Sequence, residues 1–247
     1  MKSKLRLCKD EHGKSVNSTD FKSLVGGLRY LVHTRPDIAY ASCWSSEHIY
    51  GKTCHNAPEC SQENTSVCTR TVEFGLVYLK GQGDYLLSGF SDSYLAGNLD
   101  DRKSTTGVAF YLNDSLVTWI SQKQRWVALS SCEAEFMAVT AASCQAIWLR
   151  NVLNQITDGG TDPVVLYVDN KSAIDLAKNP VFHGHSKHIH IRFHFIRECV
   201  ERGDIIIKYV GTEQQKADVL TKAMCAVKFE QMRKLLGVKN LQKNNLA

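Results

Sequence analysis

Four acidic residues lie at or near the ends of predicted elements, where a carboxylate can bind a cation. Asp92 follows the apolar strand YLLSGFS, Asp169 follows VVLYV, and Glu135 and Asp218 lie early in two predicted helices. Carboxylates that pack together repel one another, which raises their pKa values and costs stability. Oxygen ligands of this kind suit Mg²⁺, and two such ions about 3.5–4 Å apart can hold the attacking water and the leaving oxygen of a phosphodiester. We therefore interpret the four acids as a candidate site for two Mg²⁺ ions, for which Mn²⁺ could substitute.

Each acid also has an ordinary structural role open to it. An Asp at a strand end commonly shapes a turn or caps the next helix, and Asp169 could cap the helix that follows it. Ser130 with Glu133 three residues later fits a capping box, in which the Glu carboxylate reaches back to the Ser130 amide. Glu135 lies beyond that box and is free to turn toward the sheet. The metal interpretation therefore depends on the four acids meeting in space.

The last predicted helix repeats this arrangement. It covers residues 213–236, and Thr212 with Gln215 forms a second possible capping box. Asp218 lies further in, directly before Val219 and a leucine. Because charged residues mostly face solvent, an acid beside the apolar stripe of a helix is a candidate functional residue.

The elements that must position these acids alternate in type from residue 84 onward. Strands are predicted at 85–92, 164–169 and 204–210, a hairpin at 107–121, and helices at 130–153, 185–203 and 213–236. An antiparallel meander followed by βαβ crossovers predicts an α/β protein with a five-stranded mixed sheet, three antiparallel strands and then two parallel ones, flanked by helices. Ligands bind beyond the carboxyl ends of the strands of such sheets, so Asp92 and Asp169 are expected side by side.

The bulk composition is that of a globular protein with a mild positive charge. The chain has 247 residues, 43% of them hydrophobic, and a formal net charge of +5, which is compatible with a polyanionic partner. No apolar run approaches the roughly 18 residues of a membrane span, and the N-terminus lacks the apolar core of a signal peptide. The nine cysteines form no CxxC pair. These features predict reduced thiols and an intracellular location, cytoplasmic or nuclear, without secretion.

Long stretches of the sequence resemble a known family. FSDSYLAGNLDDRKSTTG, TWISQKQRWVALSSCEAEFMA, AIWLRNVL, YVDNKSAIDLAKNPVFHGHSKHIHIRFHFIRE and KADVLTK are similar to the ribonuclease H domain of copia-type retrotransposon Pol polyproteins. Upstream, SLVGGLRYLVHTRPDIAYA resembles the segment that joins the reverse transcriptase to that domain. The resemblance implies a ribonuclease H-like fold at 81–226, a partial connecting segment at 1–80, and the end of a C-terminal helix with a tail at 227–247.

The resemblance also implies a role for each acid. Asp92, Glu135, Asp169 and Asp218 match the metal ligands of the family, so Asp92 would bridge both ions. Asp218 would hold the ion that activates water, and the other two acids would hold the ion on the leaving-group side. The implied reaction is endonucleolytic cleavage of the RNA strand of an RNA–DNA hybrid. The implied partners are the hybrid and the rest of the polyprotein with its reverse transcriptase, because the sequence contains no polymerase signature of its own.

Basic residues near the predicted active edge are candidates for contacts with phosphates. Seven residues on loops or helix starts belong to this set: Arg102, Lys103, Lys123, Arg125, Lys171, Lys187 and His188. Charged loops are often simply solvated, so this assignment needs a test. With about six phosphate contacts, the affinity for nucleic acid would fall steeply as the salt concentration rises. His190 and His194 have the i, i+4 spacing of a helical zinc pair, but no third ligand is evident nearby, which favours packing or substrate contact for this histidine-rich stretch.

Two other functional classes compete with the nuclease. A catalytically inactive remnant would at most bind nucleic acid, and it would bind hybrid in Mg²⁺ without cutting it. An integrase or transposase core shares the sheet and the two-metal chemistry, but its last acid is typically a Glu on a late helix. In this chain the Glu lies on the first long helix of the predicted sheet region, which disfavours strand transfer.

Overall fold

The fold is described from a computed structural model of the chain, which covers residues 18–47, 65–78, 85–157, 162–178 and 187–242. The elements, in chain order, are α1 (Ser18–Leu31), η1 (Pro36–Ile38), α2 (Ala39–Glu47), β1 (Phe74–Leu76), β2 (Leu87–Tyr94), β3 (Thr105–Leu112), β4 (Ser115–Lys123), α4 (Ser131–Thr157), β5 (Val164–Val168), α5 (Lys171–Lys178), α6 (Lys187–Glu201), β6 (Ile205–Tyr209), η2 (Thr212–Gln214), η3 (Lys216–Leu220), α7 (Ala226–Leu236) and β7 (Val238–Asn240). A further helical stretch covers residues 65–70.

The central sheet has five strands in the order β4-β3-β2-β5-β6. β2, β3 and β4 form an antiparallel meander, whereas β5 joins β2 and β6 joins β5 in parallel. The β3–β4 hairpin turns at Asn113, whose positive φ of 53° is tolerated by asparagine. The predicted α/β class and ribonuclease H-like arrangement, with three antiparallel strands and then two parallel ones, are confirmed.

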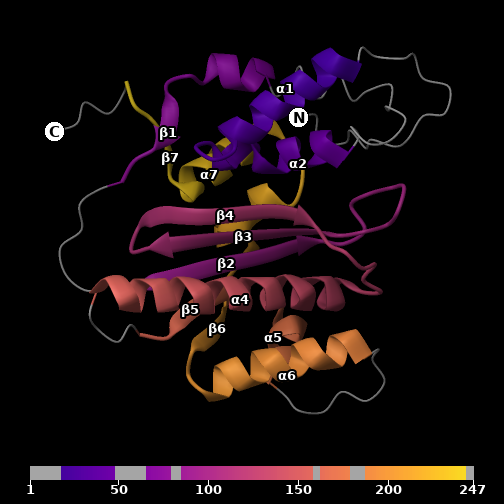
Figure 1. The fold of residues 1–247 in the computed structure, drawn as a ribbon, viewed down its shortest axis with the longest axis vertical. Helices are drawn as coiled ribbons and strands as arrows, with labels where there is room; N and C mark the ends of the chain where they lie inside the picture. The colour runs from indigo at the N-terminus through magenta and orange to yellow at the C-terminus, as the bar shows by residue number, and fades with distance from the viewer. Residues whose placement is uncertain (1–17, 48–64, 79–84, 158–161, 179–186, 243–247) are drawn as a thin grey trace.

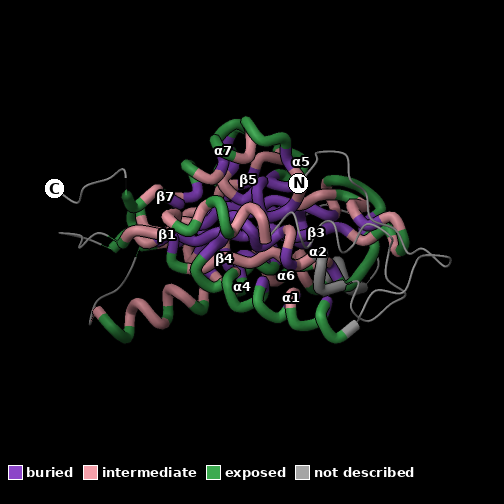
Figure 2. The backbone as a smooth tube through the Cα atoms, turned by 90° about the horizontal axis from the view of Figure 1, so that it is seen from above, coloured by how far each residue is buried: buried purple, intermediate pink, exposed green. Residues whose placement is uncertain are grey.

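Helices cover both faces of the sheet (Figure 1). On one face, Phe110 and Leu166 pack against Ala142 and Ala146 of α4, and α6 adds Cys199. On the other face, Tyr111 and its neighbours pack against η3 and α7. The alternation of side chains along each strand explains this division, because successive residues point to opposite faces. Figure 2 shows the buried residues concentrated along the strands and the exposed residues on the outer surfaces of the helices.

The segment before the sheet packs on the same face as α7. Ala39 of α2 belongs to that apolar core, and the Trp119 indole of β4 donates a hydrogen bond of 3.0 Å to the Val32 carbonyl. Arg35 is buried and binds the Asp37 carboxylate with two nitrogens, at 2.9 and 2.8 Å. In addition, β1 pairs with β7 in a separate two-stranded sheet. The upstream segment and the C-terminal segment therefore contact each other; the domain boundaries given above stay predictions.

The prediction of one continuous helix over residues 213–236 is wrong. The chain forms two short 3-10 turns, η2 and η3, and begins α7 only at Ala226. The second capping box is also absent, because the Gln215 side chain accepts from the Ala217 amide at 3.3 Å instead of reaching back to Thr212. A 3-10 turn lets buried Asp218 and Leu220 approach the sheet closely, and packing against the sheet outweighs helix propensity here.

Candidate metal centre

Three of the four acids meet at one edge of the sheet. Asp92 lies on β2 one residue beyond its last pair with β5, since Ser91 pairs with Val168, the residue before Asp169. β2 itself continues to Tyr94, two residues past the predicted end of the strand. Glu135 reaches the same edge from the first half of α4. Asp92, Glu135 and Asp169 each offer one carboxylate oxygen, and these oxygens lie within 4.8 Å of one another. The structure therefore places these three predicted residues together.

Asp169 is not needed to cap the helix that follows it. The Asn170 side chain accepts from the Ala173 amide at 3.1 Å, and the Asn170 carbonyl accepts from the Ile174 amide at 3.1 Å. Asn170 therefore provides the N-terminal cap of α5. This arrangement leaves the Asp169 carboxylate for the cluster.

Glu135 is buried, and only one of its carboxylate oxygens has a hydrogen-bond partner. Oε1 accepts from the Ser93 amide at 3.0 Å, whereas Oε2 has no partner among the described residues. The capping role belongs to Glu133, as predicted, although its carboxylate accepts from the Leu129 amide at 2.9 Å and not from that of Ser130. Ser130 accepts from the Glu133 amide at 3.1 Å, so the start of α4 is capped without Glu135.

Asp218 lies next to this group but is paired with a lysine. The Lys222 ammonium lies 2.7 Å from Asp218 Oδ1 and 4.0 Å from Asp92 Oδ2. Thr221 donates a hydrogen bond to Asp92 Oδ2. The fourth predicted ligand is thus buried beside the cluster, and one cation of the chain itself compensates part of its negative charge.

Burial and mutual repulsion raise the pKa values of the acids. Burial is the main cause for Asp92, whose pKa rises to about 7; Asp218 and Asp169 raise it further, while Lys222 and Thr221 oppose the rise. Burial, then Asp92 and Asp169, raise the pKa of Glu135 to about 9. The pKa of Asp169 is also raised, first by burial. Burial acts to lower the pKa of Lys222, but the surrounding carboxylates outweigh it and raise that pKa.

The residues present fit a divalent cation. The Glu135 Oε2 atom is buried without a partner and belongs to a set of carboxylates that destabilise one another when charged. A bound cation would provide the missing partner and favour the charged forms. An all-oxygen donor set matches Mg²⁺ or Mn²⁺ better than the softer metals, which prefer Cys or His. Asp92, Glu135 and Asp169 could hold such an ion, and Asp218 could join them once Lys222 moves away.

Residue-pattern reasoning missed three residues of this site. Thr221 and Lys222 contact the acids directly, and buried Gln215 hydrogen-bonds to the Ser91 carbonyl at 2.9 Å. The stretch KADVLTK, which already marked Asp218, contains the first two. Because they lie three and four residues after Asp218 in the chain, a helical projection from Asp218 would have placed them on its face.

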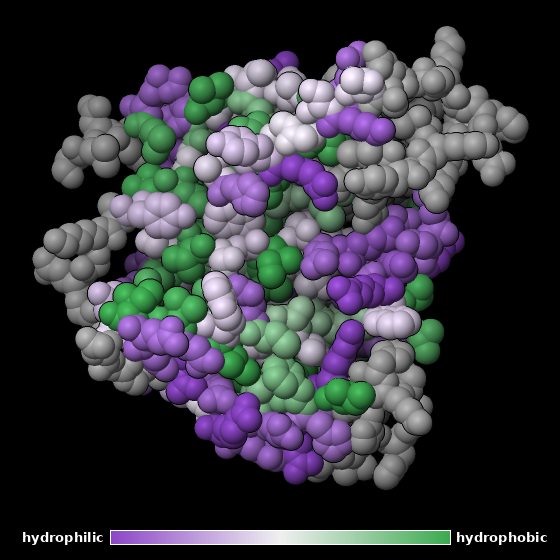
Figure 3. Space-filling model, viewed as in Figure 1, coloured by the Kyte–Doolittle hydropathy of each residue, from purple (hydrophilic) through white to green (hydrophobic). Residues whose placement is uncertain are grey.

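Two of the predicted phosphate-binding lysines are held together by an acid. Asp101 lies 2.9 Å from the Lys123 ammonium and 3.7 Å from that of Lys103. Arg102, in the same β2–β3 loop, is exposed and has a positive φ of 55°. Figure 3 shows hydrophilic side chains gathered at the right-hand end of the sheet, where β2 and β4 end in Figure 1. Lys103 and Lys123 are paired with Asp101, whereas Arg102 forms no ion pair among the residues that the structure describes, so Arg102 is the strongest phosphate candidate of the loop.

The other predicted contacts are spread around the same edge. Arg125 is exposed between β4 and α4. Lys171 is exposed at the start of α5, with its ammonium 5.0 Å from the centre of the Tyr209 ring. The side chains of Lys187 and His188 lie outside the described residues, as does most of the histidine-rich stretch. Within the described ranges, the three-acid cluster is the one group of potential metal ligands found.

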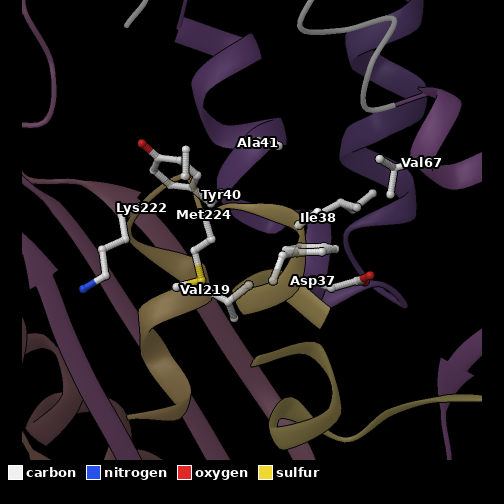
Figure 4. A pocket seen from close by; sticks show the side chains of 11 residues that line it. Asp37, Ile38, Tyr40, Ala41, Val67, Val219, Lys222 and Met224 are labelled. Atoms are coloured by element: carbon white, nitrogen blue, oxygen red, sulfur yellow. The ribbon is translucent and has the colours of Figure 1, made fainter. Parts of the chain in front are cut away.

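A pocket of about 190 Å³ lies between the upstream segment and α7 (Figure 4). Its walls include Tyr40, Val219, Met224 and Phe229, and Lys222 lies on its border. In Figure 4 the Lys222 side chain extends away from Asp37 and Ile38 at the far side. None of the four acids lines this pocket, so the candidate chemistry is at the sheet edge and not in the pocket.

Among the described residues, every helix is too short or too polar to span a lipid bilayer.

Known proteins with similar sequences include transposon polyproteins. The chain is 36% identical over 231 residues to the retrovirus-related Pol polyprotein from transposon RE1 of Arabidopsis thaliana, a match that covers 91% of the chain and 15% of the polyprotein. It is also 36% identical over 228 residues to the corresponding polyprotein from transposon TNT 1-94 of Nicotiana tabacum, covering 88% and 16%. A shorter match at 37% identity over 135 residues covers 54% of the chain and 94% of the secreted RxLR effector protein 161 of Plasmopara viticola. The chain therefore spans only a small part of the polyproteins it matches.

Known structures with a similar fold include ribonucleases H. LC11-RNase H1, isolated from compost, aligns with a TM-score of 0.43 at 17% identity over 61% of this chain and 98% of its own. Its complex with an RNA/DNA hybrid aligns with a TM-score of 0.40 at 14% identity over 55% and 93%. At these scores the fold assignment rests on the strand order of the sheet itself. No protein-family model matches the sequence. The homologues of this chain, at about 36% identity over about nine-tenths of its length, are thus retrovirus-related Pol polyproteins from transposons, and the part that matches them contains the ribonuclease H-like sheet.

Proposed function

We propose that this chain is a divalent-metal-dependent endonuclease that cleaves the RNA strand of RNA–DNA hybrids. The observation that supports this most directly is the convergence of Asp92, Glu135 and Asp169, whose oxygens lie within 4.8 Å of one another. The similarity to transposon Pol polyproteins and the sheet order support the same chemistry. In the intact element the reverse transcriptase part of the polyprotein would supply the hybrid. An intracellular location, cytoplasmic or nuclear, stays a prediction.

The residues of the chain have distinct roles in this proposal. Asp92, Glu135 and Asp169 would hold one Mg²⁺ ion, and Asp92 together with Asp218 would hold a second. Bound Mg²⁺ would lower the pKa of a water and neutralise the charge that develops at the scissile phosphate. The protein holds the acids in place before any metal arrives, through the Ser93 amide on Glu135 and the Thr221 hydroxyl on Asp92.

The proposed substrate follows from the surface around the acids. Arg102, Arg125 and Lys171 are exposed on loops or helix starts that follow β2, β4 and β5 in the chain, and they suit contacts with the phosphate backbone. Such contacts are independent of base sequence. A hybrid would be distinguished from duplex DNA by its shape and by the 2′-hydroxyls in its wide minor groove.

The test is cleavage of a hybrid whose RNA strand carries a label, in Mg²⁺ or Mn²⁺ and in EDTA. We expect metal-dependent internal cuts in the RNA strand and none in the DNA strand or in duplex DNA. Asp92→Asn and Asp169→Asn should abolish cleavage while leaving hybrid binding in place. Hybrid that is bound but stays intact at saturating Mg²⁺ and Mn²⁺ would instead identify an inactive, nucleic-acid-binding remnant.

A further inference from the structure

Gln215 is a fully buried polar residue that none of the catalytic steps above uses. Its exposed fraction is 0%, and it lies directly before η3, the turn that carries Asp218. A buried amide is costly unless its donors and acceptor all find partners. The partners of Gln215 are therefore informative about why this residue lies at the metal centre.

The Gln215 side chain makes two hydrogen bonds to two different segments. Its Nε2 donates to the Ser91 carbonyl at 2.9 Å, directly before Asp92. Its Oε1 accepts from the Ala217 amide at 3.3 Å, directly before Asp218. The Gln215 amide also acts to lower the pKa of the nearby Asp169 carboxylate, and its nitrogen has a second hydrogen available for that acid.

Only an amide of this length makes both bonds and presents a donor near Asp169. Glu at position 215 would still accept from the Ala217 amide but would have no hydrogen to donate to the Ser91 carbonyl. Met would match the length and lose both bonds. The two segments are otherwise distant in sequence, because Ser91 and Gln215 are 124 residues apart.

We propose that Gln215 is a positioning residue that fixes Asp92, Asp169 and Asp218 relative to one another, and thereby sets the affinity of the centre for divalent metal. This inference rests on the proposed metal site and adds a determinant of its geometry. Outer groups that hold metal ligands in place typically change metal affinity by about 10–100-fold when they are removed. We expect a change of that size for Gln215→Met.

The test compares Gln215→Met with Ser121→Ala. Ser121 donates to the Leu220 carbonyl at 2.7 Å and so ties the same 3-10 turn to the sheet without touching an acid. Mn²⁺ binding is measured by isothermal titration calorimetry on the full chain. We expect roughly 10–100-fold weaker binding in Gln215→Met and an affinity close to wild type in Ser121→Ala. Equal affinities in Gln215→Met and wild type would overturn the inference.

A metal-free measurement separates this inference from the proposed function. In EDTA, Gln215→Met should shift or broaden the backbone amide NMR signals of residues 91–93, 169–170 and 217–218 together. Ser121→Ala should affect the turn alone. If the signals at 91–93 and 169–170 stay unchanged in Gln215→Met, Gln215 does not position those segments and the inference fails. If Gln215→Met does not fold, Gln215→Glu, which keeps the shape and the bond to Ala217, provides the same amide comparison.

Asp92→Asn serves as the control for the metal site itself. If wild type shows no Mn²⁺ binding that Asp92→Asn removes, the proposed metal centre is refuted. The amide pattern in EDTA then still decides whether Gln215 holds the three acidic segments together.

Discussion

The stability of the metal-free protein should fall as the pH rises from 5 to 7. Asp92 and Glu135 have ordinary pKa values of 3.8 and 4.5, which the folded protein raises to about 7 and about 9. Between these limits the unfolded chain has lost protons that the folded chain retains. The free energy of unfolding therefore decreases with rising pH. The stabilising contribution is fully present below the unfolded pKa values and is lost as the pH rises through the folded ones.

The size of this effect follows from the number of protons retained. Glu135 alone keeps its proton in the folded protein from pH 5 to 7, so the free energy of unfolding falls by about 1.4 kcal/mol for each pH unit. Two units correspond to a loss of about 3 kcal/mol. For a chain of this size, 1 kcal/mol shifts the melting temperature by about 2–4 °C, so we expect a fall of roughly 6–12 °C. Bound Mg²⁺ should reduce this fall, because it favours the charged carboxylates.

The assay is thermal unfolding followed by circular dichroism in EDTA at pH 5, 6 and 7. The matched control is the double variant Asp92→Asn/Glu135→Gln, in which both acids are replaced by neutral groups of the same shape. Histidines and other titrating groups are common to both proteins, so the difference in slope reports the two acids. Parallel slopes for wild type and the double variant would refute the electrostatic description of the cluster.

Three further predictions concern the surroundings of the acids. Lys222→Met should lower the melting temperature in EDTA and tighten Mn²⁺ binding by at least about tenfold in calorimetry. Unit charges 4 Å apart near a protein surface interact by about 4 kcal/mol, and about 1.4 kcal/mol of this is enough for a tenfold change; unchanged or weaker binding would count against a competing ammonium. Gly107→Ala should abolish hybrid cleavage, because a Cβ there would lie 2.8 Å from the Ala217 carbonyl and displace the turn. The control is Gly89→Ala, which crowds side chains on the α4 face. It should cost about 1–3 kcal/mol of stability and keep hybrid cleavage; equal loss of cleavage in the two variants would contradict this prediction. Arg125→Ala should weaken hybrid binding and reduce its logarithmic salt slope by about one, and an unchanged slope would exclude a phosphate contact.

The outline of the sheet edge could be predicted because it depends on local patterns. Apolar runs lead directly into Asp92 and Asp169, and the parallel pairing of β2 with β5, which ends at Ser91 and Val168, brings these two acids together. Glu135 could be separated from Glu133 because the capping box assigns a structural role to Glu133 alone. Each of these steps uses a periodicity or a spacing within a single element.

The remaining part of the site depends on contacts between distant segments. Helix propensity favours one helix after Thr212, but packing of Leu220 against the sheet selects a 3-10 turn. The bond of Gln215 to the Ser91 carbonyl, 124 residues away, follows from that turn, so no local pattern reveals it. The neutralisation of Lys103 and Lys123 by Asp101 likewise depends on the pairing of β3 with β4.

The pairing of β1 with β7 determines how the protein would respond to mechanical tension. Phe74 faces Asn240, and the Leu241 amide donates to the Glu73 carbonyl at 2.8 Å. Force applied to the polypeptide before Phe74 and after Asn240 would therefore act on the same end of the ladder and open its bonds one after another. Antiparallel strands that unzip in this way resist pulling less than strands that must slide, so this small sheet should yield before the five-stranded one.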